Sequence, residues 1–166
     1  GNGDNNANFA DNFESYGDIF FEGGGTAYLQ SDLAGVSTLS LNDGTFNTNN
    51  NSITVSSIRI NSDLSISKWG SSNVYITYSF ASNSSTATIN PGTSNFIFGN
   101  ECNGETYLWG NSVSLNTVVF NSQTRIEPDN TFNNLIVNAG GILQLQSGST
   151  QTILDSLKLV GTRSAI

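Results

Sequence analysis

Apolar residues at alternate positions recur in short pairs along the whole chain. The pairs are Ile19 and Phe21, Leu39 and Leu41, Ile58 and Ile60, Val74 and Ile76, Phe96 and Phe98, Val118 and Phe120, Leu135 and Val137, and Leu157 and Leu159. Such alternation predicts β-strands that bury one face. The first members of successive pairs are 16 to 22 residues apart, which is the length of one turn of a solenoid. The pattern therefore predicts one column of stacked strands.

A second, weaker series of apolar residues follows the first after 7 to 11 residues in most units. Its members are Ala27, Phe46, Ile66, Tyr107, Ile126 and Leu143. This offset indicates that each turn carries more than one strand. The Ser-rich stretch 81–92 has no clear member, and we expect it to form a loop that bulges from its coil.

A coil of about 20 residues cannot bury its own apolar face, whereas coils stacked about 4.8 Å apart share one core. We therefore expect an all-β fold, a right-handed parallel β-helix (β-solenoid) of about seven or eight coils. A β-sandwich of short antiparallel strands is the alternative. Residues 1–166 are expected to form a single domain, a fragment of a longer repetitive protein. Its open ends would expose strand edges and core side chains unless flanking coils cover them.

Three asparagines, Asn61, Asn121 and Asn138, each directly follow a strand of the first series. Their amide side chains can satisfy backbone groups within a turn, or they can stack on the next coil as an asparagine ladder. Both interpretations remain open at the level of sequence.

Composition narrows the choice of partners. Only 36% of the residues are hydrophobic and 11% are charged, and 13 acidic residues against 5 basic ones give a formal charge of -8. Such a surface repels phosphate backbones, so nucleic acid is not an expected partner. The sequence contains no run of about 18 apolar residues, so direct membrane insertion is not expected. No signal peptide is evident. Cys102 is the single cysteine, so it is either an inert thiol or pairs between molecules.

Three segments carry a family resemblance, together with the opening stretch 13–25. They are residues 38–49 (TLSLNDGTFNTN), 131–141 (TFNNLIVNAGG) and 156–162 (SLKLVGT). They resemble the large repetitive β-helical surface proteins of Bacteroidetes-type bacteria, which are often exported by type IX secretion. The resemblance implies an extracellular, cell-surface location and a role as a rod or spacer in adhesion, gliding or matrix attachment. It implies flanking segments of the same protein, a surface polysaccharide or another cell-surface protein as partners, and no catalytic residues.

The residues themselves also argue against an enzyme. The chain has no histidine, which excludes Ser-His and Cys-His nucleophilic systems and histidine-based metal sites. A polysaccharide-active β-helix enzyme with paired carboxylates, or a calcium site, is the alternative. Its candidate residues are Asp18, Glu22, Asp43 and Asp63 with Arg59, and Glu127 and Asp129 with Arg125. We interpret them as solvated turn residues and expect no cofactor, with calcium as the one exception considered.

A third functional class is ligand binding on an exposed face. Trp69, Tyr107 and Trp109 are the candidate carbohydrate contacts, but Trp69 and Trp109 could equally cap the core or pack against a loop, which is the interpretation we favour for these two. Ice binding would need regular ranks of threonine. Here the segments 86–88 (TAT) and 150–152 (TQT) are isolated rather than repeated at the coil spacing.

Overall fold

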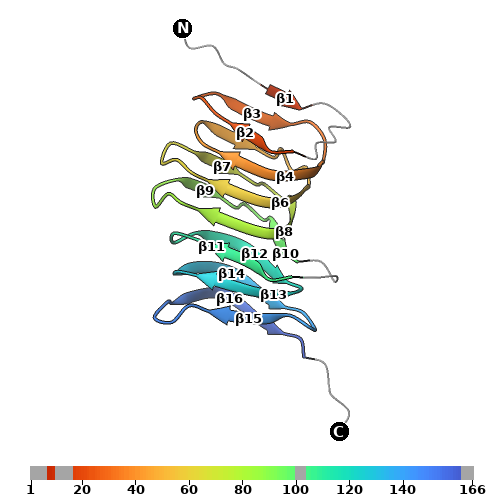
Figure 1. Ribbon diagram of the computed structural model, residues 1–166, viewed down its shortest axis with the longest axis vertical. Coiled ribbons are helices and arrows are strands. Elements are labelled where there is room, and N and C mark those ends of the chain that lie inside the picture. Colours follow the sequence, from red (N-terminus) through yellow and green to blue (C-terminus); the bar gives the residue numbers. More distant parts are fainter. Residues whose placement is uncertain (1–6, 10–16, 100–103, 162–166) are drawn as a thin grey trace.

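The protein folds as a β-solenoid of about seven turns with about 21 residues in each coil. The computed structural model describes residues 7–9, 17–99 and 104–161, and Cys102 lies outside them. The coils stack in sequence order from the N-terminal to the C-terminal end (Figure 1). Every pair of neighbouring strands is parallel. The predicted parallel β-helix is thus confirmed, and the sandwich alternative is wrong.

The described residues form sixteen strands, most of them short. They are β1 (Ala7–Phe9), β2 (Ile19–Phe21), β3 (Thr26–Leu29), β4 (Leu33–Leu41), β5 (Thr45–Asn47), β6 (Ile53–Ile60), β7 (Ile66–Lys68), β8 (Asn73–Ser82), β9 (Thr88–Asn90), β10 (Asn95–Phe98), β11 (Thr106–Trp109), β12 (Ser114–Phe120), β13 (Gln123–Glu127), β14 (Asn130–Val137), β15 (Ile142–Leu145) and β16 (Gln151–Leu159).

The strands line three sides of the coil, which we call faces A, B and C. Face A is the sheet β1-β3-β5-β7-β9. Face B stacks residues 53–55, 74–76, 95–98, 117–120, 134–137 and 156–159. Face C stacks residues 19–21, 39–41, 58–60, 79–82, 107–109, 123–126 and 142–145.

The long strands bend around different corners in the two halves of the rod. β4, β6 and β8 begin on face B and end on face C, whereas β12, β14 and β16 reach face B only in their second halves. Irregular register marks the bends, for example between Val55 and Ser57 and between Phe132 and Asn134. The continuous corner therefore moves from one side of face B to the other between β8 and β12.

Side chains that point inward from all three faces form one core. Ring contacts run from Phe46 to Trp69, from Trp69 to Phe96 and from Phe96 to Phe80, with centroid distances of 5.9, 5.5 and 5.8 Å. The indole N–H of Trp69 donates to the Oγ atom of Ser67 over 3.0 Å. This hydrogen bond satisfies the indole N–H of Trp69 inside the core.

The predicted single column of apolar pairs proves to be two columns. The first three pairs, at 19–21, 39–41 and 58–60, lie on face C, and the other five lie on face B. Ile58 stacks on Phe80, and Val74 stacks on Ile53. The 16-residue interval from Ile58 to Val74 is short because it runs from face C to face B and is not a full coil. Similar alternating pairs occur on both faces, so the sequence pattern does not distinguish them.

The Ser-rich stretch 81–92 is not a loop that bulges from its coil. It contains β9, which continues face A by pairing Ile66 with Thr88 and Ser67 with Ile89. Ile89 packs against the core. β9 forms although only one of its residues is partly buried, because its backbone hydrogen-bonds to β7.

Asparagine side chains bond from coil to coil along the rod, and two of these ladders contain the residues named from the sequence. In the first, Asn61 donates to the Oδ1 atom of Asn42 over 2.9 Å and accepts from Asn83. In the second, Asn138 donates to the Oδ1 atom of Asn121 over 2.7 Å. The ladder interpretation of Asn61, Asn121 and Asn138 is thus confirmed, with Asn61 in a different ladder from the other two.

The turn between faces A and B repeats a left-handed backbone. Asn50, Gly70 and Gly92 have φ angles of 66°, 55° and 57°. A Cβ atom on Gly92 would lie 2.3 Å from the carbonyl oxygen of Gly70. Both the backbone angle and the contact with the preceding coil therefore require glycine at this position.

Candidate functional site: an aromatic cluster on face C

Three aromatic side chains gather on the outer surface where β8 and β11 lie side by side. The ring centroids of Tyr78 and Tyr107 are 5.5 Å apart, and those of Tyr107 and Trp109 are 5.0 Å apart. Tyr78 is 48% exposed and Trp109 is 40% exposed. We call Tyr78, Tyr107 and Trp109 the aromatic cluster.

Strand alternation explains why two of these rings face outward. Leu108 lies between them in the sequence and is fully buried, so Tyr107 and Trp109 must project from the opposite side of β11. Their partners on β8 are Ser79 and Ala81, both small and both buried. Small neighbours leave room for the large rings to lie along the sheet.

Tyr78 reaches the same surface because β8 turns the corner from face B to face C. Thr77 and Tyr78 are both exposed, although Ile76 and Phe80 are both buried. Strict alternation from Ile76 to Phe80 would bury Tyr78, and the bend in the strand overrides it. No residue type marks this bend, so Tyr78 was not among the contacts expected from the sequence.

Charged groups border the cluster on the next strand, β13. Arg125 pairs with Tyr107 in the ladder, Glu127 pairs with Trp109, and the two charged side chains form a salt bridge. The side chain of Arg125 is 50% exposed and that of Glu127 is 21% exposed. The cluster thus has a partly solvated cation and anion along one edge.

Tyr107 is also held from its own strand. Its hydroxyl donates to the Oε2 atom of Glu105 over 2.8 Å. This hydrogen bond is the main reason that the pKa of Tyr107 lies above its usual value, and desolvation adds to the effect. The Glu105 contact fixes the direction of the ring, because the phenol is tied at its far end.

Two polar groups of the cluster are left for other partners. Neither the indole N–H of Trp109 nor the hydroxyl of Tyr78 has a hydrogen-bond partner among the described residues. Both belong to exposed side chains. Each can therefore bond to a ligand without breaking a contact to a described residue.

Of the three residues proposed from sequence as carbohydrate contacts, the structure brings two together. Tyr107 and Trp109 are neighbours in the cluster. Trp69 is a correction, because it is completely buried between Phe46 and Phe96 and offers no surface to a ligand. Trp69 follows the end of β7 and is buried, whereas Trp109 is the last residue of β11 and is exposed.

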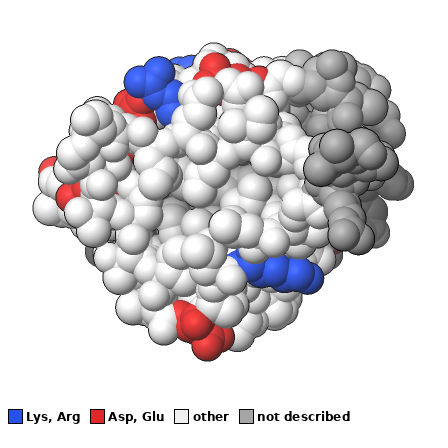
Figure 2. Space-filling view, turned by 90° about the horizontal axis from the view of Figure 1, so that it is seen from below, with Lys and Arg blue, Asp and Glu red and all other residues white. Residues whose placement is uncertain are grey.

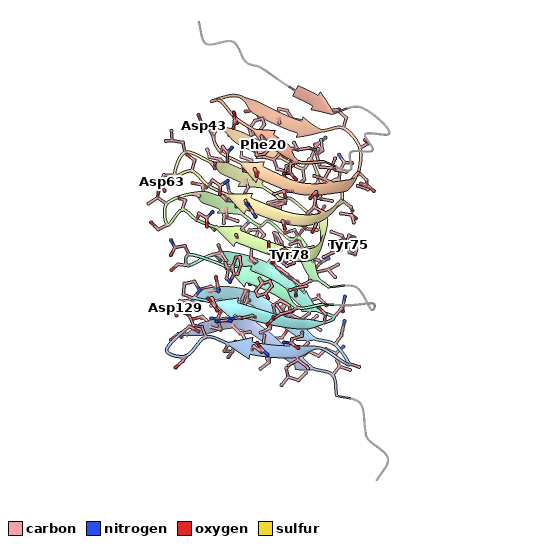
Figure 3. The ribbon with its side chains drawn as sticks, viewed as in Figure 1. Phe20, Asp43, Asp63, Tyr75, Tyr78 and Asp129 are labelled. Carbon is pink, nitrogen blue, oxygen red and sulfur yellow. The ribbon has the colours of Figure 1, made fainter. Side chains whose placement is uncertain are left out.

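The acidic candidates do not converge. Asp43, Asp63 and Asp129 lie at separate levels along one edge of the rod (Figure 3). Asp43 accepts from the backbone N–H of Gly44 over 2.6 Å, and Asp129 accepts from that of Thr150 over 2.6 Å. These carboxylates act as turn residues, as the sequence suggested.

Other acidic candidates are bonded to neighbouring coils or are exposed. Glu22 accepts from the amide of Asn42 over 3.0 Å. Asp63 accepts a hydrogen bond from Ser84, and this bond is the main cause that lowers the pKa of Asp63. Asp18 and Arg59 are exposed. Across the described ranges, no three His, Cys, Asp or Glu side chains come close enough together to hold a metal ion.

The threonines considered for ice binding do not stack on one another. Thr88 stacks on Ile66 and Thr152 stacks on Thr131. On face A, Ile66 interrupts the row in which Thr45 and Thr88 lie. A regular threonine array is therefore not what this face presents.

No family model, curated protein or solved structure matches the chain. Within the residues that the structure describes, no helix is both long and apolar enough to cross a membrane.

Proposed function

We propose that this chain is a non-catalytic structural segment of an extracellular bacterial surface protein, a rod or spacer that serves adhesion or matrix attachment. The observation that carries the proposal is the unbroken parallel ladder. Faces B and C pair from coil to coil along the rod, and asparagine ladders tie its corners. Such a ladder keeps a rod stiff over its length, which is what a spacer requires.

The end of the last coil supports further coils of the same protein as a partner. Leu157 and Leu159 are 54% and 66% exposed, although their partners Leu135 and Val137 in the preceding coil are buried. Seen from this end, mostly uncharged atoms cover the surface, and the charged side chains lie at its edge (Figure 2). An apolar end with open strand edges suits the stacking of another coil.

The engaged carboxylates favour a structural role over the enzyme alternative. Asp63 and Asp129 each bond a residue of the following coil. A catalytic pair would instead hold two carboxyl groups about 5 to 9.5 Å apart around a sugar. In this proposal, Asp63 and Asp129 therefore stabilise the stacking of successive coils.

Single-molecule stretching tests the rod directly. The chain is placed between well-characterised marker domains and pulled from both ends. We expect stepwise unfolding in units of one coil, about 70 to 75 Å of extended chain each. Extension without resistance, or one unfolding step for the whole chain, would contradict a stiff modular rod. Release of reducing ends from soluble polysaccharides by the same protein would instead favour the enzyme.

A further inference from the structure

We propose that the aromatic cluster of Tyr78, Tyr107 and Trp109, together with Arg125 and Glu127, is a binding site for neutral polysaccharide. This inference deepens the proposed adhesive function and rests on it for its biological role. The site lies on one outer face of the rod, where a long glycan chain can approach without entering a cavity.

Phe20 and Tyr75 are also exposed, at 61% and 41%, and what sets the cluster apart is that its three rings contact one another. The largest fully buried side chains include Phe46, Phe80, Phe96, Phe98, Phe120, Phe132 and Trp69. The fold thus has ample core space for aromatic residues, yet Tyr78 and Trp109 remain on the surface. Exposed aromatic surface that gathers in one place marks an interaction site more often than scattered exposure does.

The chemistry of the cluster fits a sugar. An aromatic ring offers a flat apolar face to the C–H groups of a pyranose, while tyrosine and tryptophan keep a polar group at the edge. The indole N–H of Trp109 and the hydroxyl of Tyr78, which have no hydrogen-bond partner within the described part of the chain, can bond sugar hydroxyls. Because β11 is paired with a strand on both sides, Tyr107 and Trp109 are held by a rigid sheet rather than by a loop.

The salt bridge beside the rings supplies both kinds of hydrogen-bonding partner. Arg125 offers planar N–H donors and Glu127 offers carboxylate acceptors, which together match the donor and acceptor character of hydroxyl groups. Their mutual pairing holds them in place. Since Arg125 lies beside Tyr107 and Glu127 beside Trp109, a sugar on the rings would lie within reach of this polar edge.

Charge selects neutral glycans over acidic ones. The chain carries a formal charge of -8, and the site contains the carboxylates of Glu105 and Glu127 against the single cation of Arg125. An acidic polysaccharide would therefore meet repulsion both at long range and at the site. We accordingly assign the site to neutral polysaccharide.

Native gel electrophoresis through gels that contain a dissolved polysaccharide tests the assignment. The probes are mannan, hydroxyethyl cellulose and xyloglucan as neutral glycans, and alginate as an acidic one. We expect at least one neutral glycan to retard the wild-type chain and alginate to leave it unretarded. Loss of retardation, corresponding to an affinity at least tenfold lower, is expected for Trp109→Ala and Tyr107→Ala.

Tyr75→Ala is the matched control. Tyr75 is 41% exposed, close to the 40% of Trp109, but it lies on face B outside the cluster. This variant should be retarded like the wild type. The proposal is overturned if none of the three neutral glycans retards the chain, if alginate retards it equally, or if Trp109→Ala and Tyr75→Ala behave alike.

Fluorescence provides a second, independent readout. In the Trp69→Phe variant, Trp109 is the single tryptophan, so its emission reports on the site alone. We expect the neutral glycan that retards the chain to shift this emission to shorter wavelength and to protect it from acrylamide quenching. An unchanged spectrum at saturating glycan would overturn the site. Trp109→Ala should leave the stretching pattern of the rod unchanged, so failure of the site and failure of the rod are distinguishable.

Discussion

The side-chain amide of Asn83 donates a hydrogen bond to the Oδ1 atom of Asn61, one coil away, over 2.7 Å. Asn61 passes the interaction on to Asn42, and Asn42 donates to Glu22. Four successive coils are therefore joined at one corner by side chains as well as by backbone.

Replacing Asn61 by alanine should remove two of these hydrogen bonds. Because each net hydrogen bond contributes about 0.5 to 1.5 kcal/mol and this corner is exposed, we expect the free energy of unfolding to fall by about 1 kcal/mol. Urea denaturation measures the change. The control is Asn111→Ala, since the exposed side chain of Asn111 makes no hydrogen bond to a described residue. Equal effects of the two variants would show that the ladder contributes nothing.

Two aromatic residues on β8 test the assignment of the bend. Phe80 is fully buried and Tyr78 is 48% exposed. We expect Phe80→Ala to lower the free energy of unfolding by about 3 to 5 kcal/mol. Tyr78→Ala should change it by about 0.5 kcal/mol or less. A large loss for Tyr78→Ala in urea denaturation would mean that β8 alternates strictly and that Tyr78 points inward.

The hydrogen bond from Ser84 to Asp63 should make stability depend on acid pH. Since it lowers the pKa of Asp63 below the ordinary value of 3.8, the folded state favours the carboxylate. This contribution is present above pH 3.8 and is lost as the pH falls through the lower pKa of the folded state.

We therefore expect the urea concentration at the unfolding midpoint of the wild type to decrease as the pH is lowered below 3.8. The decrease should be shallower in Asp63→Asn. Asp155→Asn serves as the control, because the exposed carboxylate of Asp155 has no hydrogen-bond partner among the described residues. It should keep the wild-type slope. Identical pH profiles for wild type and Asp63→Asn would show that Asp63 does not contribute to the pH dependence of stability.

The apolar end of the last coil should make this chain self-associate. Leu157 and Leu159 lie in core register but are exposed. Sedimentation velocity should show concentration-dependent association of the wild type, which the double variant Leu157→Asn/Leu159→Asn reduces. Leu64→Asn is the control, because Leu64 is 70% exposed but isolated in a turn. A wild-type chain that stays monomeric at high concentration would show that the end is already protected.

Much of the architecture could be predicted from the sequence. Alternating pairs such as Leu39 and Leu41 indicate strands because one face of each strand is buried, and this signal is local. Their arrangement into faces is not local. Ile58 could stack equally well on Val74 or on Phe80 by hydrophobicity, and only three-dimensional closure of the coil decides for Phe80.

The candidate site was predictable in part. Tyr107 and Trp109 flank a leucine, which signals an outward-facing pair. The outward direction of Tyr78 results from the bend in β8, and no particular residue type marks the position of that bend. Trp69 was considered as a surface contact because its sequence neighbours Ser67 and Ser72 are polar, although the structure buries both serines and both form hydrogen bonds.

The movement of the continuous corner between β8 and β12 has a consequence for how such a rod can be lengthened. A coil copied from the β4 to β8 half carries its bend between faces B and C, so it can be inserted there without changing the cross-section. The same coil inserted between β12 and β16 would meet neighbours whose bend lies on the other side of face B. We therefore expect whole-coil duplications to be tolerated within each half and rejected across the boundary.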